Sequence, residues 1–592
     1  MSIRIINLIN LVKICINIRR IIIQINGIHT SHISSTCFII DITDIIIPGI
    51  IHYRLALAIS KYNNNIGSKT RGNAIVFNPN EVINELLTGV PNVEAMSALN
   101  PMVELHMREN ITKKGFKGVN SDRSYTEEKR TYDDTMIGKA ALSSPNNANV
   151  GMNRQLVADP KIESVRGYTS TAGVDTDFND LQLSSFSELL TPSTVSRDDA
   201  IRTAIATSQT SHIVSTEGAQ PVLISNGVDE MVPAYLTEEF SYVAREDGKV
   251  LEINEDYMIL QYKSGKKKAV QIGQKESFNS GSGFYVDNRL TTNFQAGDSF
   301  KQGDVLAYHE KFFSKDSDGV VRLNIGPLAK VAFAGLYSTY EDAGLVTHKM
   351  SKLLETKLAM CETVKLDATD DIEKVVKVGD EVEIGDPLVV FGLGDTGDKS
   401  VDSFLKAFQT GDNNDILDNA KRIIRAKHAG KIVDVRMYTT KSMDRLSPSL
   451  FDLLDEHFKH NLQRKKILDK YDKTDSPYKM DTMFTLPTAP LKGTTIKGIT
   501  CDVLIEIYIE HADEASVGDK LTVYAASKQV LSEVVPPGLE PFSEERPDEE
   551  ISIFTSPRSI LGRMVPSIML IAAGNKCLVE LKRKMKDIWE QQ

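Results

Sequence analysis

Cysteine is scarce in this sequence, and long apolar runs are missing from it. The 592 residues include five cysteines, which are widely spread and form no CxxC pair. We therefore expect neither a zinc site nor a disulfide framework, and a reducing compartment fits best. No run of about 18 consecutive apolar residues occurs, so we expect no membrane-spanning helix and no membrane partner.

Several common catalytic motifs are also missing. There is no G-x-x-x-x-G-K-[ST] loop, no H-E-x-x-H, and no Gly-rich strand-turn-helix suited to a dinucleotide. These absences exclude a self-contained P-loop NTPase, zincin protease or dehydrogenase. The net charge of −11, from 69 basic and 80 acidic residues, argues against a lone nucleic-acid-binding domain, which usually carries a basic face. It allows one wall of a larger machine whose basic residues gather in one channel.

The start of the chain differs in composition from everything that follows. Isoleucine fills 21 of the first 51 positions, with no clean period of 3.6 or 2 residues. The segment also lacks the layout of a signal peptide, one apolar core followed by a small-residue cleavage site. We expect residues 1–70 to be an Ile-rich, poorly constrained extension that is open to disorder and dispensable, with a membrane-surface segment as the alternative.

Short β-like runs dominate the middle of the chain. Residues 248–253 and 257–262 are typical of strands, and the Ser264-Gly265 turn that follows indicates a hairpin. Residues 403–428 and 447–470 have apolar spacings of three and four, which predict helices. For this length we expect about four domains.

Two segments share the pattern G-D-x-[VF]-x-x-G-D-x-[VL], at residues 297–306 and 379–388. Glycine tolerates the positive φ that such turns need, and Asp can accept hydrogen bonds from the turn amides. The pattern is typical of barrel-sandwich hybrid modules. Lipoyl and biotinyl carriers share it, but they need a modifiable Lys at a hairpin tip, and none is evident. We therefore expect structural β modules.

Six further runs occur in a fixed order. They are L-N-P-M-V-E-L (99–105), S-P-N-N-A-N-V-G-M (144–152), R-D-D-A-I-R-T-A-I (197–205), V-A-F-A-G-L-Y-S-T-Y-E-D-A (331–343), V-G-D-K-L-T-V-Y-A-A-S-K-Q-V (517–530) and P-R-S-I-L-G-R-M (557–564). In order and spacing they resemble T-N-P-L-x-E-L, T-P-E-G-P-N-I-G-L, H-D-D-A-N-R-A-L-M, V-A-F-x-x-W-x-G-Y-N-Y-E-D-A, V-G-D-K-M-A-G-R-H-G-N-K-G-V and N-P-x-G-V-P-S-R-M. These are motifs of the β subunit of multisubunit DNA-directed RNA polymerases.

The resemblance spans residues 80–592 and matches the C-terminal part of that subunit. The family's first half, the protrusion and lobe, has no counterpart here. Two motifs depart from the family: E-G-P in the second run is N-N-A, and the Gly and His between the two lysines are lost. A split, diverged subunit of this kind is similar to those of giant bacteriophages. The implied fold is α+β, multidomain and β-rich, with barrel-sandwich hybrid modules and helical insertions.

The resemblance also implies a division of the chain. Residues 71–155 would be a fork-like region, and residues 156–345 a hybrid-binding, active-centre region with a β-barrel module. Residues 346–495 would match the wall and flap. Residues 496–592 would contain a second active-centre segment and the start of a clamp-facing region.

The same motifs imply site residues for nucleotidyl transfer. Glu341 and Asp342 would lie near a second Mg²⁺, with Asp342 as its ligand, directly or through water; acidic pairs are common on surfaces, so the residues alone leave this open. Lys520 and Lys528 would hold the phosphates at the RNA 3′ end. Arg202 and Arg563 would clamp the incoming triphosphate, a role that suits the planar fork of arginine. These are the catalytic and substrate-binding residues that we expect.

The primary Mg²⁺ would lie on a partner, because the N-A-D-F-D-G-D loop that holds it belongs to the β′ subunit. The run Asp175, Asp177 and Asp180 faintly resembles that loop, but it lacks the Gly, and a solvated loop is the alternative. The expected partners are β′-like subunits, a polypeptide supplying the missing part of β, a promoter-specificity factor, template DNA, nascent RNA and NTPs. The cytoplasm of an infected bacterium is the expected location, with packaging in the virion left open. A non-catalytic scaffold derived from a polymerase and a virion structural protein built on barrel-sandwich modules are the alternative functions.

Overall fold

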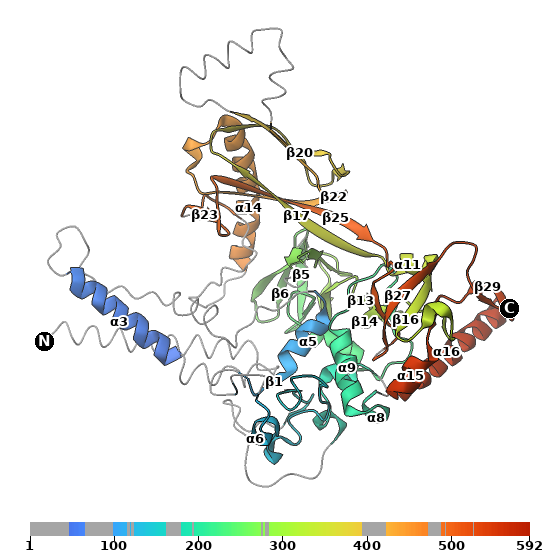
Figure 1. Cartoon of the computed structure of the whole chain (residues 1–592). Helices are drawn as coiled ribbons and strands as arrows, with labels where there is room; N and C mark the ends of the chain where they lie inside the picture. The colour runs from blue at the N-terminus through green and yellow to red at the C-terminus, as the bar shows by residue number, and fades with distance from the viewer. Residues whose placement is uncertain are drawn as a thin grey trace.

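The computed structural model describes residues 47–65, 99–114, 119, 124–160, 179–191, 194–273, 276–278, 283–393, 422–471, 487–491, 493–524 and 526–591. Over this part the chain is a multidomain α+β protein rich in strands, as the sequence predicted (Figure 1). The described strands form several separate sheets, none of which closes into a barrel.

The Ile-rich extension is described only in part. Residues 47–65 form α3 (Ile47–Asn65), a helix that the irregular apolar pattern did not predict. Residues 1–46 and 66–98 lie outside the described part of the chain, as do Asp175 and Asp177. None of the helices that the structure describes is both long and apolar enough to cross a membrane.

The first compact region is built mainly from short helices. Its longer helices are α5 (Pro101–Glu109) and α9 (Ala200–Thr210). Asn100 caps α5 by accepting a hydrogen bond from the Val103 amide at 2.8 Å, and its own amide donates to the carbonyls of Ser211 and Ile213 at the end of α9. The N-P-M-V-E-L motif therefore ties α5 to α9. The shorter elements are β1 (Asn110–Thr112), α6 (Glu127–Arg130), η3 (Asp134–Met136), β2 (Asn153–Gln155), η4 (Asp180–Gln182), α7 (Phe186–Leu189) and α8 (Thr194–Arg197).

A strand-rich module follows, and it confirms the predicted hairpin. β5 (Gly248–Ile253) pairs antiparallel with β6 (Tyr257–Tyr262), which turns at Gly265 into β7 (Lys267–Gln271). Residues such as Val250, Met258 and Leu260 form its buried core. The remaining elements are β3 (Gln220–Pro221), η5 (Val228–Glu230), α10 (Val232–Tyr235), β4 (Ser241–Val243), β8 (Glu276–Phe278), β9 (Tyr285–Asp287), β10 (Leu290–Thr291), β11 (Ser299–Phe300), β12 (Val305–His309), β13 (Phe313–Lys315) and β14 (Val321–Gly326).

The Gly-Asp pairs form the turns that the sequence predicted. Gly297, Gly303, Gly379 and Gly385 all have φ between 93° and 100°. The Asp after each glycine accepts a hydrogen bond from the amide three residues earlier, at 2.7–2.8 Å. Both segments thus use one turn design, with the glycine supplying a conformation that costs other residues free energy.

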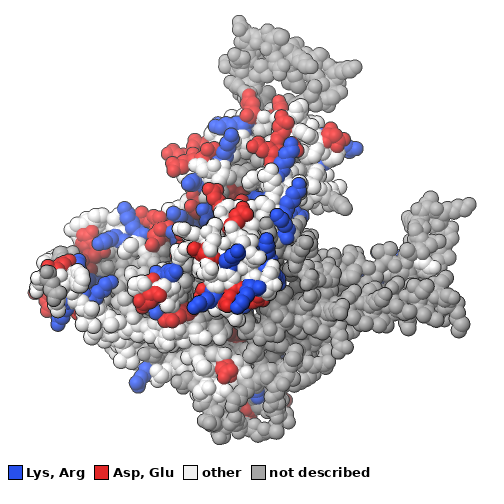
Figure 2. Space-filling view, turned by 180° about the vertical axis from the view of Figure 1, so that it is seen from behind, with Lys and Arg blue, Asp and Glu red and all other residues white. Residues whose placement is uncertain are grey.

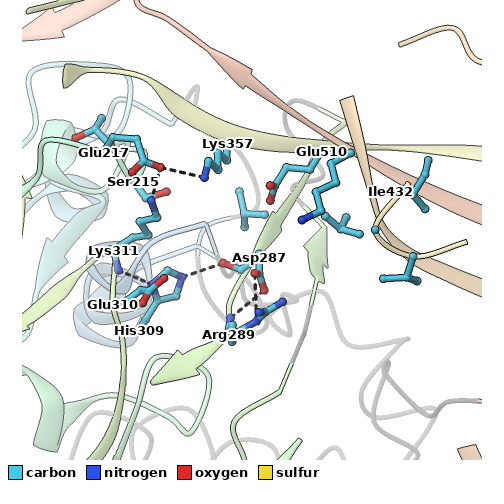
Figure 3. Close-up of a pocket in the computed structure, with 16 residues that line it drawn as sticks. Ser215, Glu217, Asp287, Arg289, His309, Glu310, Lys311, Lys357, Ile432 and Glu510 are labelled. Atoms are coloured by element: carbon cyan, nitrogen blue, oxygen red, sulfur yellow. Dashed lines mark hydrogen bonds and ion pairs between the residues drawn. The ribbon is translucent and has the colours of Figure 1, made fainter. Parts of the chain in front are cut away.

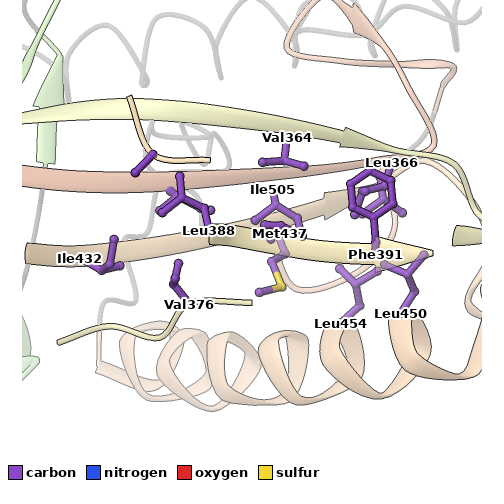
Figure 4. Packing of buried hydrophobic residues seen from close by; sticks show 14 of the residues in the cluster. Val364, Leu366, Val376, Leu388, Phe391, Ile432, Met437, Leu450, Leu454 and Ile505 are labelled. Atoms are coloured by element: carbon purple, nitrogen blue, oxygen red, sulfur yellow. The ribbon is translucent and has the colours of Figure 1, made fainter. Parts of the chain in front are cut away.

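Two long strands form an arm between the lower and upper parts of the molecule (Figure 1). β17 (Thr356–Leu366) and β25 (Val503–Asp513) pair antiparallel along their full lengths, and β22 (Gly430–Thr439) pairs with β25. α14 (Pro448–Tyr471) covers this sheet, with Leu450 and Leu454 fully buried (Figure 4). The predicted helix at 447–470 is confirmed. The other elements are β18 (Asp370–Val375), β19 (Glu381–Val382), β20 (Pro387–Leu393), β21 (Arg422–Arg425), η7 (Met443–Arg445), β23 (Thr495–Ile496) and β24 (Ile499–Thr500).

The helix predicted over 403–428 is wrong at its end. Residues 422–425 form β21, which pairs antiparallel with β20, whereas residues 403–421 lie outside the described part of the chain. Strand pairing with β20 outweighs the local helical pattern here, because sheet hydrogen bonds and burial against neighbours decide the structure of short segments.

A five-stranded sheet near the C-terminus brings together segments that are far apart in sequence. Its strand order is β15-β30-β16-β27-β26. β16 pairs parallel with β27 and antiparallel with β30, so the chain crosses over between neighbours. The bounds are β15 (Val331–Phe333), η6 (Tyr337–Thr339), β16 (Ala343–Thr347), α11 (His348–Leu353), β26 (Lys520–Thr522), β27 (Lys528–Val535), β28 (Phe542–Ser543), β29 (Arg546–Glu550), β30 (Ile553–Thr555), α15 (Pro557–Arg563) and α16 (Pro566–Glu590).

Candidate functional site

The predicted acidic pair and the first predicted lysine lie on either side of one strand. Asp342 directly precedes β16, and its carbonyl accepts a hydrogen bond from the Val530 amide on β27 at 2.8 Å. On the other edge of β27, Val530 is paired with Lys520, the first residue of β26. Segments 331–343 and 517–530, which are far apart in the sequence, therefore meet at Val530.

Arg563 joins this group through a direct ion pair with Asp342. It is the last residue of α15, whose Ser559 donates a hydrogen bond to the Glu341 carbonyl at 3.0 Å. The Ser559 hydroxyl also lies 3.4 Å from Asp342 Oδ1. One helix thus holds both the backbone of the acidic pair and the carboxylate of Asp342.

A third set of Gly-Asp turn contacts places Lys520 at the start of its strand. Gly518 has φ of 103°, like the glycines of the two β modules. The Asp519 carboxylate accepts a hydrogen bond from the Ser516 amide at 2.8 Å, and Gly518 and Asp519 exchange backbone hydrogen bonds with Leu531 of β27. The Gly-Asp pair before Lys520 was the sequence signal for this turn. The repeated sequence pattern, however, predicted such turns only for the two earlier segments.

The second lysine shares the same hairpin. Lys528 begins β27 and is paired with Thr522 of β26, whereas Lys520 is paired with Val530. Directly opposed residues of an antiparallel pair point to the same face of the sheet. Lys520 and Lys528 are both exposed there, so the hairpin presents two cations on one face.

Arg202 lies in the first turn of α9, and two contacts fix that helix against the C-terminal sheet. Thr522 donates a hydrogen bond to the Gln209 side chain at 3.1 Å. The Asp198 carboxylate, just before α9, accepts hydrogen bonds from the Ser567 amide and hydroxyl at 3.1 and 2.6 Å. α9, which carries Arg202, is therefore held between β26 and the start of α16.

A small apolar cluster fills the space between these elements. Ala206 of α9, Ala526 of the β26–β27 turn and Ile560 of α15 are its buried members, together with Val565 and Ile568. The cluster joins α9 and α15, which carry Arg202 and Arg563, to the turn between the strands of Lys520 and Lys528. Of the six predicted site residues, only Asp342 and Arg563 bond to each other directly among the described residues.

Backbone strain concentrates at the same place. Of the five described non-glycine residues with positive φ, four belong to this region: Glu341, Tyr524, Ala526 and Met564. The left-handed conformation costs roughly 1–2 kcal/mol for a residue with a Cβ. Such residues cluster at functional sites, where the surrounding structure holds them in place. Glu341 is one of the predicted site residues, and Met564 directly follows another.

The exposed carboxylates of Glu341 and Asp342 are chemically suited to magnesium. Mg²⁺ prefers oxygen ligands and is usually held by one or two carboxylates together with substrate phosphates. No group of three or more His, Cys, Asp or Glu side chains gathers for a metal in the described part of the chain. Two carboxylates fit an ion that a nucleotide helps to hold.

One buried residue of the site was not predicted. Gln529, between Lys528 and Val530, is 3% exposed, and neither polar atom of its amide has a hydrogen-bond partner among the described residues. A Cβ on Gly344 of β16 would lie 2.4 Å from Gln529 Oε1. The family motif that this segment resembles has Gly at this position. The difference was therefore visible in the sequence, but the burial of Gln529 against β16 was not.

A separate pocket of about 340 Å³ is lined by residues of the long strands β17, β22 and β25 and of the shorter strands β9 and β12 (Figure 3). Glu217 contacts both Lys311 and Lys357 across it, and hydrogen bonding to Lys311 lowers the pKa of the Glu217 carboxyl. Burial lowers the pKa of His309 to about 4, and its Nε2 bonds to the Asp287 carbonyl at 2.9 Å. The charges are largely matched within the pocket, and none of the predicted site residues lines it.

On the described part of the face in Figure 2, surface charge does not single out a binding region. Lys and Arg are interspersed with Asp and Glu over the described part of the face in Figure 2. No known protein-family model matches the chain.

Proposed function

We propose that this chain is part of a multisubunit DNA-directed RNA polymerase, matching the C-terminal part of its β subunit. In this role it lines the active centre and the RNA–DNA hybrid channel and supports nucleotidyl transfer from NTPs to the RNA 3′ end. The observation that carries the proposal is the convergence of the motif residues. Asp342, Lys520 and Arg563 come from three separated segments and meet around β27 through the Val530 pairing and one ion pair.

The chemistry available at this place agrees with the proposal. Phosphoryl transfer depends on alignment and charge neutralisation more than on covalent catalysis. Two exposed lysines on one hairpin face can hold phosphates as point charges. Two arginines, on α9 and α15, can grip phosphate oxygens bidentately. A non-catalytic scaffold would have no need of both pairs and two carboxylates together.

Each residue then has a role. Lys520 and Lys528 hold the phosphates at the RNA end and align the attacking hydroxyl. Arg202 and Arg563 hold the incoming triphosphate. Asp342, with Glu341 beside it, holds the second magnesium together with the nucleotide. When bound, Mg²⁺ would neutralise charge that develops on the transferred phosphoryl group.

The remaining parts of the enzyme would come from partners. The loop for the primary magnesium would lie on a β′-like chain, and another polypeptide would supply the protrusion and lobe. A promoter-specificity factor, template DNA and nascent RNA complete the assembly, in the cytoplasm of an infected bacterium or packaged in the virion. Within this chain, the two Gly-Asp segments would be barrel-sandwich hybrid modules, supported by their matching turns.

Co-purification followed by a transcription assay tests the proposal. The chain, tagged and isolated from its native source, should bring with it a polypeptide that carries a D-F-D-G-D loop. The complex should extend a primed RNA on a DNA template, whereas the chain alone should not. RNA synthesis by the single polypeptide would contradict the proposal, as would isolation of the chain only with capsid or tail proteins, which the virion structural alternative predicts.

A further inference from the structure

The C-terminal half of α16 carries an apolar stripe that faces solvent. Leu578, Leu581, Met585 and Ile588 follow one another at spacings of three, four and three residues, which places them on one side of the helix. They are between 40% and 63% exposed. We call these four residues the α16 stripe. Their spacing is that of the a and d positions of a heptad repeat, the pattern of helices that pair side by side.

Nearer the start of α16, the a and d positions that precede the stripe are packed against the rest of the chain. Ile571 and Gly574 occupy the preceding a and d positions. Ile571 is 4% exposed, and a Cβ on Gly574 would lie 2.2 Å from Ile224 Cδ1. The chain's own body therefore packs on the first heptad, and the α16 stripe continues the packing surface past the end of that body.

The body does not cover the stripe from another side. Glu580 and Arg583, on the opposite face of α16, bond to Arg546 and Glu549 of β29. β29, which lies beside α16 in Figure 1, thus fixes the back of the helix and leaves the α16 stripe exposed.

Charges beside the stripe indicate what could cover it. Lys582 and Lys584 occupy the e and g positions on its two edges, and both are exposed. Neither makes an ion pair within the part of the chain that the structure describes. In paired helices, e and g residues form the interhelical ion pairs that select the partner. A second copy of α16 would offer these edges no acidic residue, because its own e and g positions include Lys582, Lys584, Cys577 and Trp589.

We propose that the α16 stripe docks an amphipathic helix of a partner polypeptide, with apolar residues at its a and d positions and Asp or Glu at its e and g positions. The apolar stripe supplies the buried area, and the lysines supply the choice of partner. This docking surface follows from α16 alone, whatever reaction the chain supports.

Binding of two synthetic heptad-repeat peptides to the full chain tests the proposal. Both peptides have Leu at a and d; one has Glu at e and g, and the other has Lys. Fluorescence anisotropy should give at least about tenfold tighter binding of the Glu peptide, because like charges across an interface are strongly disfavoured. Met585→Glu should abolish that binding, since it buries a charge in the middle of the stripe.

Charge reversal distinguishes this proposal from nonspecific hydrophobic binding of the peptides. The double variant Lys582→Glu/Lys584→Glu should exchange the preference, binding the Lys peptide better than the Glu peptide. The control Lys576→Glu/Lys586→Glu makes the same change of charge at positions that face away from a paired helix, and it should keep the original preference. Equal binding of both peptides, no binding of either, or self-association of the chain that Met585→Glu removes would each overturn the proposal.

Discussion

Arg563 and Asp342 form an ion pair although 221 residues separate them in the sequence. The pair joins the end of α15 to the start of β16, beside the strand that also positions Lys520. In the proposed enzyme each member has another ligand: triphosphate for Arg563 and magnesium for Asp342. A magnesium nucleotide could satisfy both at once, so the ion pair would hold the two side chains near their working positions before substrate binds.

Breaking this ion pair should affect activity far more than stability. The Asp342 side chain is 50% exposed and that of Arg563 is 26% exposed, and such pairs contribute about 0–1 kcal/mol. We expect Asp342→Asn to leave the Tm of the chain within a few degrees of wild type while nucleotide addition by the reconstituted complex falls. A large drop in Tm with normal activity would make the pair merely structural.

The arginines and lysines should differ in kinetic effect. Arg202→Ala and Arg563→Ala should mainly raise the KM for NTP, because they would bind the triphosphate in the ground state. Lys520→Ala and Lys528→Ala should mainly lower kcat, because they would align the attacking hydroxyl. Steady-state kinetics over a range of NTP concentrations separates the two effects. The same change in KM and kcat for all four variants would contradict the assigned roles.

The buried amide of Gln529 should reduce stability. A buried polar group without a hydrogen-bond partner costs about 1–3 kcal/mol, so Gln529→Met, which keeps the shape and removes the polar atoms, should raise the free energy of unfolding by a similar amount. Gln209→Met is the matched control, since Gln209 accepts a hydrogen bond from Thr522 and its loss should destabilise the chain. Urea unfolding measures both, and destabilisation by Gln529→Met would show that the amide has a partner in solution.

Glu109 should make stability depend on pH. It is buried beside Ser187, and burial raises the pKa of its carboxyl to about 8. The unfolded chain releases this proton near its ordinary pKa, so between that value and about 8 the folded state binds more protons. Stability contributed by Glu109 should therefore fall as pH rises through this window, by about 1.4 kcal/mol per pH unit.

The variant Glu109→Gln isolates this effect. Gln mimics the protonated acid and cannot ionise, so its stability relative to wild type should increase steadily from pH 5 to pH 8. Unfolding of both proteins is followed across that range. A constant difference would mean that Glu109 is ionised in the folded chain.

The sequence predicted local structure better than long-range contacts. The strands at 248–253 and 257–262, the Gly-Asp turns and α14 follow from turn chemistry and apolar spacing, and all are present. β21 was missed because its pairing with β20 outweighs the local pattern. The family motifs pointed to Asp342 and Arg563 individually, but their ion pair depends on how β16, β27 and α15 pack. Short-range patterns carry no information about that packing, nor about the burial of Gln529.

Single-nucleotide addition by the reconstituted complex, measured at an NTP concentration well below KM, tests the central claim most directly. Lys520→Ala and Arg563→Ala each remove a charge-assisted hydrogen bond worth roughly 1.5–3 kcal/mol, so each should slow addition by about 10- to 150-fold. Lys352→Ala and Arg558→Ala are the controls, because both residues are exposed and lie outside the proposed contacts, and they should add nucleotides at the wild-type rate. Wild-type rates for both Lys520→Ala and Arg563→Ala would contradict the claim that this chain lines the active centre.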